Sequence, residues 1–224
     1  MTGGHGAAAT LEAEHRAIAL FTRAMAGRAL RIEARGLAVT ALHLAPPATD
    51  ADAIRVPATV DGFASRHEAR GALRIAVLRE VLRQSEHRSL PAGSGVVVTE
   101  RRPVLLRRVH ALLERARLDA RIRARCPGAS PDLDRVLDAA LAQRGPTRPL
   151  TGARDLLDAF ARGSARLDPS TPSALGGSAP IDPTGRLARM LEAATVAARA
   201  DATSADTLHA ARTVVALLAG ALTR

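Results

Sequence analysis

The chain has 224 residues, of which 47% are hydrophobic and 24% charged, and this composition is ordinary for a globular protein with a sizeable core. Three phenylalanines are the only aromatic residues, so the core must be aliphatic, which favours packed helices over a β-sandwich. The formal net charge is +10 and the sequence contains no lysine, and this excess of arginine suits an acidic partner surface or nucleic acid.

Cysteine content and hydropathy indicate the compartment. Cys126 is the only cysteine, which excludes an intrachain disulfide and is typical of a reducing, cytoplasmic setting. The N-terminal segment lacks the basic and apolar regions of a signal peptide, and the most apolar run, residues 214–222, is too short to span a bilayer. We expect a cytoplasmic protein without membrane insertion.

The N-terminal part predicts one helix and a small β region. We expect residues 1–9 to be disordered, and a helix to begin after Thr10, which can cap it, and to end at Gly27. Residues 29–44 alternate apolar and polar side chains around a turn near Gly36, which predicts a β-hairpin. Pro57 restricts the extended piece that follows to an edge position, so the predicted β region covers about 29–57.

The middle of the chain predicts three more helices. Ser65 and Glu68 form a capping-box pattern that opens a long helix to about residue 89, and its two apolar sides indicate a central position. A second helix is expected over about 103–125. A third begins at Ser130, as its cap, and ends before the segment GPTRP.

The C-terminal part predicts a further helix over about 152–162, which completes a main domain of residues 10–162. Residues 163–185 are rich in Gly, Pro, Ser and Thr and are expected to form a linker or long loop. Residues 186–224 are expected to form a helical hairpin that packs on the main domain. The last helix has heptad-like apolar spacing and needs a partner helix, either within the fold or through self-association. The fold class is therefore mainly α, a bundle of about seven helices with a small β-hairpin near the N-terminus.

One arginine of the helix over 103–125 lies at the edge of its apolar stripe. At about 100° per residue, Arg117 projects about 40° from Leu113, so it needs a partner, and Glu114 can pair with it at i, i+3. The same flank carries His110 and Arg121. If Arg117 were on the surface, this ridge would be a candidate docking surface.

Two further pairs on this helix, Arg115 with Asp119 and Asp119 with Arg123, are predicted to lie on its solvated side.

The long helix from Ser65 carries a second polar row, Glu80, Gln84 and His87, close to its apolar face. A carboxylate, an amide and an imidazole on one face could bind a metal. The stretch RQSEH, however, lacks the two histidines of H-E-x-x-H, which leaves zinc with too few ligands. We expect an internal hydrogen-bond network instead, with no metal, cofactor or catalytic residue. A degenerate metal-dependent hydrolase that uses Glu80, His87 and Glu114 is the enzymatic alternative.

Nucleic-acid binding is a second alternative, because the chain is basic. The arginines are spread along the whole sequence and aromatic residues that could stack on bases are nearly missing, so we expect nucleic acid to be an improbable partner.

Two stretches together resemble a known family. VPATVDGFASRHEARGALRIAVLREVLRQSEHRSL and LLERARLDARIRARCPGASPDLDRVLDAAL are similar to the N-terminal helical region of the NorD/CbbO family. Its members are von Willebrand factor A proteins that work with MoxR-type AAA+ ATPases to activate nitric oxide reductase or Rubisco. The similarity extends over residues 55–145, and the matching positions are Pro57, Gln84, His87, Glu114, Arg117, Asp119, Arg121, Pro127, Gly128, Asp132 and Leu133.

Some family positions differ. Arg83, Ser89, Arg115 and Cys126 replace the family's usual His, Glu, acidic residue and aromatic residue. The family's C-terminal von Willebrand factor A domain has no counterpart in these 224 residues, so we expect a divergent, shortened relative, a split-gene half or a fragment.

The resemblance implies a structural and partner-binding motif formed by six residues: Gln84, His87, Glu114, Arg117, Asp119 and Arg121. In this interpretation Glu114 and Arg117 form an internal pair that ties their helix to the helix of Gln84 and His87. The implied function is a non-catalytic adaptor or scaffold, whose partners are an AAA+ ATPase and the target enzyme.

Overall fold

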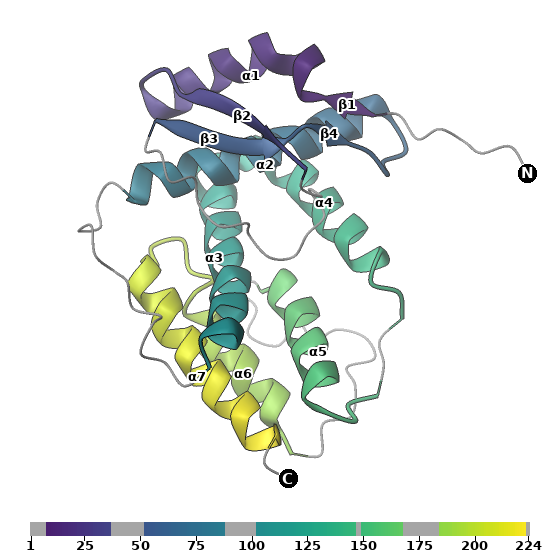
Figure 1. Cartoon of the computed structure of the whole chain (residues 1–224), viewed down its shortest axis with the longest axis vertical. Helices are drawn as coiled ribbons and strands as arrows, with labels where there is room; N and C mark the ends of the chain where they lie inside the picture. The colour runs from purple at the N-terminus through teal and green to yellow at the C-terminus, as the bar shows by residue number, and fades with distance from the viewer. Residues whose placement is uncertain (1–7, 37–51, 88–101, 147–148, 168–183, 223–224) are drawn as a thin grey trace, which may run out of the picture. The chain divides into compact units, whose positions relative to one another are not determined.

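A computed structural model describes residues 8–36, 52–87, 102–146, 149–167 and 184–222. The described residues form seven α-helices and four short strands, so the predicted mainly helical class with a small β region near the N-terminus is confirmed (Figure 1). Of the helices described, none has the length and apolarity that a membrane crossing requires. Residues 1–7 of the predicted disordered start lie outside the described residues, whereas Ala9, which that prediction included, is buried in a short strand.

The chain divides into two compact units whose sequences are interleaved. The first comprises Met1–Ala41, Ala45–Ser94 and Arg125–Ala140, and the second comprises Leu42–Leu44, Gly95–Ala124 and Leu141–Arg224. This division differs from the predicted domains, because it separates the two long central helices. It also places the final helices in the same unit as the second of these long helices.

The first unit contains most of the N-terminal half and one later helix. Its elements are β1 (Ala9–Thr10), α1 (Leu11–Ala26), β2 (Arg31–Arg35), β3 (Ala53–Pro57), β4 (Thr59–Val60), α2 (Arg66–His87), the 3-10 turn η1 (Pro127–Ala129) and nearly all of α4 (Ser130–Ala142).

The predicted signals at the ends of α1 and α2 operate in the structure. The Thr10 hydroxyl accepts a hydrogen bond from the backbone N–H of Ala13, and Gly27 ends α1 in the left-handed conformation, with φ of 68°. At the start of α2, the Ser65 hydroxyl accepts from the backbone N–H of Glu68. The helix is central, as predicted, since residues on both of its apolar sides are buried and both α1 and β3 pack against it.

The β region differs from the predicted hairpin. β2 pairs with β3 in parallel, with Ile32 opposite Ile54, and the antiparallel pair is β1 with β4. A parallel pair needs a long connection between its strands. The partner of β2 is therefore β3, which lies in the extended segment at Pro57 that was predicted as an edge strand. The predicted return strand of the hairpin, after Gly36, lies outside the described residues.

A close approach between α2 and α4 holds the later segment in the first unit. A Cβ atom at Gly71 would lie only 2.6 Å from the carboxylate carbon of Asp132. Asp132 is buried and pairs with Arg74 of α2 and, at 3.0 Å, with Arg135 of its own helix. Glycine at position 71 is what leaves room for this carboxylate.

The second unit consists of four helices, α3 (Pro103–Arg125), α5 (Ala153–Ala165), α6 (Arg186–Thr195) and α7 (Ser204–Leu222). α5, α6 and α7 pack on one another, so the last helix has its partners within the fold. Of the heptad positions, Ala211 and Leu218 are buried as predicted, whereas Leu208 and Val215 are only half-buried. The buried stripe of α7 also contains Thr207, Ala210 and Val214.

Candidate functional site

The middle of α3 is buried on every side. All eight residues from Leu112 to Asp119 are buried, which is unusual for a helix with four charged residues in that segment. Arg117, which was expected at the edge of the apolar stripe, lies in the interior, since only 1% of its surface is exposed. The prediction that Arg115 and Asp119 face solvent is wrong, because their exposed fractions are 1% and 3%.

The buried pair between Glu114 and Arg117 has the predicted i, i+3 geometry. Arg117 donates two hydrogen bonds to Oε2 of Glu114, from Nη2 at 2.7 Å and from Nε at 3.1 Å. One edge of the guanidinium thus binds one carboxylate oxygen, and both groups belong to the same helix.

The second oxygen of Glu114 contacts α7. The hydroxyl of Thr207 donates to Oε1, and Nε2 of His110 lies 3.6 Å from the same atom. Burial raises the pKa of Glu114, but the hydrogen bonds from Arg117 and Thr207 outweigh it, and the resulting pKa lies below the ordinary value. Glu114 is therefore a carboxylate at neutral pH, held by groups from two helices.

Arg115, which pairs with Asp119 on its own helix, connects α3 to α5. Nη1 of Arg115 lies 3.1 Å from Oδ2 of Asp119, and Nη2 donates to the backbone carbonyl of Ser164 at 3.3 Å. This bond shows that α5 contacts the flank of α3 that carries Arg115. The residue pattern of α3 alone could not predict this hydrogen bond, because its acceptor is a backbone carbonyl 49 positions away.

Arg121 joins the same helix to the connection between α6 and α7. Its Nη2 donates to the carbonyl of Ala202 at 2.8 Å, and its Nε donates to the carbonyl of Ala200 at 3.1 Å. Four of the six motif residues, Glu114, Arg117, Asp119 and Arg121, therefore lie in one unit. There they contribute to contacts that link α3 to α5, α7 and the loop before α7.

The remaining motif residues lie in the first unit, on α2. Gln84 is buried, and its Nε2 donates to the carbonyl of Ala53 in β3 at 2.7 Å, in keeping with the expected internal hydrogen-bond network. His87 is the last residue of α2, and its side chain lies outside what the structure describes. The tie between the helices of Gln84 and Glu114 stays a prediction, since the two residues belong to different units.

Glu80 has the same spacing to an arginine as Glu114 but a different environment. It pairs with Arg83, and both side chains are buried, while its Oε2 has no hydrogen-bond partner among the described residues. Burial therefore dominates and raises the pKa of Glu80, which the neighbouring guanidinium only partly offsets. Two similar sequence patterns thus give carboxyl groups with opposite pKa shifts.

Sequence reasoning missed the partners that come from distant segments, namely Thr207 and Ser164. A threonine in the first turn of a helix suggests only local capping, and nothing in a single sequence pairs it with a residue 93 positions earlier.

The described side chains of this cluster restrain helices. In the part of the chain that the structure describes, no three His, Cys, Asp or Glu side chains come together as a potential metal-binding group. Three buried carboxylates, Glu80, Glu114 and Asp119, are instead engaged by arginines of their own helices. Comparison with protein-family models, with curated proteins and with solved structures finds no match for this chain.

Proposed function

We propose that this protein is a non-catalytic cytoplasmic adaptor that works with a MoxR-type AAA+ ATPase on a target metalloenzyme. The proposal rests on the resemblance of the motif residues to the NorD/CbbO family. The observation that favours a scaffold over an enzyme is that these side chains are already engaged within the fold. Arg117 and Asp119 hold partners on α3 itself, Glu114 also accepts from Thr207 of α7, and Arg121 binds a carbonyl of the loop before α7. Side chains occupied in this way position helices, whereas a catalytic group must be able to reach a substrate.

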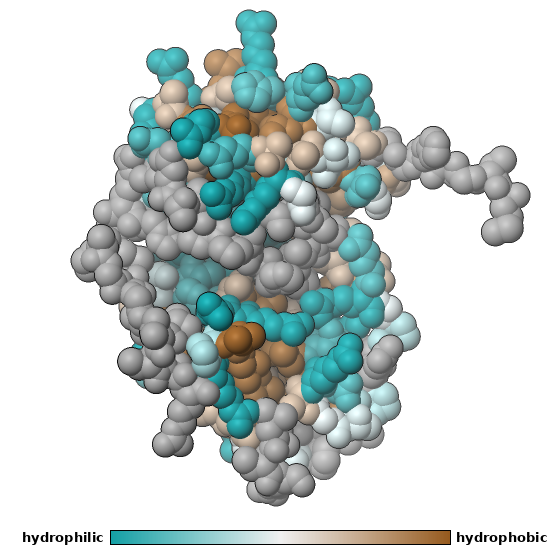
Figure 2. Space-filling model, viewed as in Figure 1, coloured by the Kyte–Doolittle hydropathy of each residue, from teal (hydrophilic) through white to brown (hydrophobic). Residues whose placement is uncertain are grey.

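The surface supports electrostatic rather than apolar partner contacts. Figure 2 shows groups of hydrophilic side chains on the described surface of each unit, with apolar side chains between them. Among the described residues, the large exposed apolar side chains are Leu20 and Met25 of α1, Val104 of α3 and Val196 just after α6. Single exposed apolar residues of this kind are normal, so a partner would be recognised mainly by the exposed arginines.

The ridge His110, Glu114, Arg117 and Arg121 is not the surface that would dock, because Glu114 and Arg117 are buried. Exposed arginines beside this core, such as Arg107 and Arg123 of α3, are better placed to meet an acidic partner.

The test is co-elution of the purified protein with the MoxR-type ATPase encoded beside its gene, at low salt, with and without ATP. A complex with the ATPase or its target is expected. Arg107→Glu should weaken it, while Arg16→Glu makes the same charge change on an exposed position of α1 and serves as the control. Separate elution of all components with and without nucleotide would contradict the proposal.

The enzymatic alternative makes the opposite prediction about metal. The proposed adaptor should contain no stoichiometric metal after purification without chelator, and its melting temperature should not change on addition of EDTA. Bound metal whose removal lowers the melting temperature would favour the hydrolase.

A further inference from the structure

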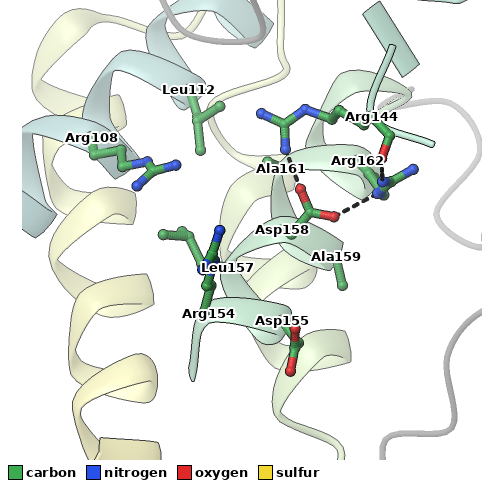
Figure 3. Close-up of a pocket in the computed structure, with 10 residues that line it drawn as sticks. All are labelled: Arg108, Leu112, Arg144, Arg154, Asp155, Leu157, Asp158, Ala159, Ala161 and Arg162. Carbon is green, nitrogen blue, oxygen red and sulfur yellow. Dashed lines mark hydrogen bonds and ion pairs between the residues drawn. The ribbon is translucent and has the colours of Figure 1, made fainter. Parts of the chain in front are cut away.

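A pocket in the second unit gathers more positive than negative charge. It has a volume of about 420 Å³ and is lined by ten residues, of which four are arginines and two are aspartates. Arg108 comes from α3, Arg154 and Arg162 from α5, and Arg144 from the turn after α4. Figure 3 shows Arg108 and Arg144 reaching toward the pocket from opposite sides, with Arg154 rising from the first turn of α5.

Both aspartates of the pocket are engaged by contacts that hold the local fold. Asp158 pairs with Arg144 and, at 2.7 Å, with Arg162, whose guanidinium also donates to the carbonyl oxygens of Arg144 and Gly145. These bonds fix the turn after α4 against α5. Asp155 accepts hydrogen bonds from the backbone N–H and the hydroxyl of Thr151, which orders the start of α5.

Arg108 and Arg154 stand apart from this network. Both side chains belong to exposed residues, and neither makes a hydrogen bond or an ion pair with any other described residue. The pocket thus holds two guanidinium groups whose charge no described carboxylate neutralises. Cations gathered in a concave site attract anions more strongly than the same cations on a convex surface.

The shape and the remaining lining indicate the kind of anion. A guanidinium offers a planar set of donors that matches two phosphate oxygens at once, and two such groups suit a doubly charged phosphate. Leu112, Leu157, Ala159 and Ala161 add apolar surface next to the arginines. A volume of about 420 Å³ is in the range typical of small-molecule sites and is too small for a folded partner.

We propose that this pocket binds a small phosphorylated organic molecule. Arg108 and Arg154 hold the phosphate, and the leucine and alanine side chains contact the organic part. Arg144 and Arg162 keep their bonds to Asp158 and contribute positive potential from the wall. This inference goes beyond the proposed adaptor function and does not depend on it.

Calorimetric titration at low salt tests the proposal with three probes: phenyl phosphate, inorganic phosphate and an oligoglutamate peptide. Saturable binding of phenyl phosphate at one site is expected, tighter than that of inorganic phosphate because the ring covers apolar surface. Arg108→Gln and Arg154→Gln should each weaken the binding by about tenfold or more, since each removes hydrogen bonds from a charged donor. Arg107→Gln removes the same charge from the adjacent, exposed position of α3 and should leave the affinity within about twofold.

Several results would overturn the proposal. One is the absence of saturable phenyl phosphate binding, and another is an equal loss of affinity in Arg107→Gln, which would indicate nonspecific attraction to the basic chain. Tighter binding of oligoglutamate, lost in Arg154→Gln, would identify the pocket as a docking site for an acidic peptide instead. Because Arg108 and Arg154 are exposed, thermal melts of their variants should match the wild type, and a lowered melting temperature would show that these arginines serve the fold.

Discussion

Replacement of Arg117 by methionine should strongly destabilise the second unit. The side chain is 1% exposed, and its partner Glu114 is 7% exposed, so the substitution leaves a buried carboxylate whose remaining polar neighbours among the described residues are Thr207 and His110. Removal of one partner from a buried ion pair costs about 3 to 5 kcal/mol. For a chain of 224 residues, that corresponds to a fall of roughly 6 to 20 °C in the melting temperature.

The assay is a double-mutant cycle with Arg117→Met, Glu114→Leu and the double variant, followed by urea unfolding. Far-UV circular dichroism is the suitable probe, because the chain has no tryptophan or tyrosine. The double variant should cost less than the sum of the single variants by about 2 to 3 kcal/mol, since it leaves neither charge unpaired. A coupling energy below about 0.5 kcal/mol would refute the reasoning, because that is the range of a solvated pair.

The same pair also predicts a pH dependence. The pKa of Glu114 in the folded protein lies below its value in the unfolded chain, which is about 4.3. The stabilisation by the pair should therefore be complete above pH 4.3 or so, and should disappear as the pH falls through the folded pKa. The difference in unfolding free energy between the wild type and Glu114→Leu should shrink correspondingly in acid.

Three other variants test separate features of the first unit. Glu80→Gln should become more stable relative to the wild type as the pH rises from about 4 to 7, an interval that begins near the unfolded pKa. The raised folded pKa favours the protonated carboxyl, so the wild type loses stability when this group ionises. Urea melts at the two pH values that give the same difference in unfolding free energy between variant and wild type would contradict this prediction. Gly71→Ala should lower stability by about 1 to 2 kcal/mol, despite the better helix propensity of alanine, because the new Cβ would collide with the Asp132 carboxylate. The control is Gly220→Ala, whose Cβ would meet no atom within 4 Å and which should be neutral or stabilising by up to about 1 kcal/mol. Equal shifts in melting temperature for the two variants would argue against the close approach at Gly71. Gln84→Met should cost about 1 to 3 kcal/mol in urea melts through loss of its hydrogen bond to the β3 carbonyl, and an unchanged midpoint would show that this bond contributes nothing.

Local signals in the sequence predicted the helices well. Thr10, Gly27 and Ser65 mark helix ends through short-range hydrogen bonds or a left-handed backbone, and these depend only on neighbouring residues. The pair of Glu114 and Arg117 was also predictable, because residues three apart on a helix lie on the same face.

Features that depend on distant segments were not predictable. Alternation of apolar and polar residues indicated a strand at β2, but it contains no information about whether the neighbouring strand is parallel or antiparallel. Arg115 and Asp119 were expected to face solvent because charged residues usually do, and the contact of Arg115 with α5 is not visible in a local pattern. The pocket arginines lie on α3, α5 and the turn after α4, so no local spacing could bring them together.

The interleaving of the two units restricts the order in which the chain can fold as it leaves the ribosome. The first unit lacks α4 until residue 140 has been made, although its α1, strands and α2 are complete more than 50 residues earlier. α3 emerges before any of its helical partners. Until α5 and α7 have been synthesised, Arg115 lacks the carbonyl of Ser164 and Glu114 lacks the hydroxyl of Thr207. During that time α3 exposes both apolar and charged side chains. Each unit needs segments that are synthesised much later than its first ones. Nascent chains of this protein should therefore depend on protection from aggregation until synthesis is nearly finished.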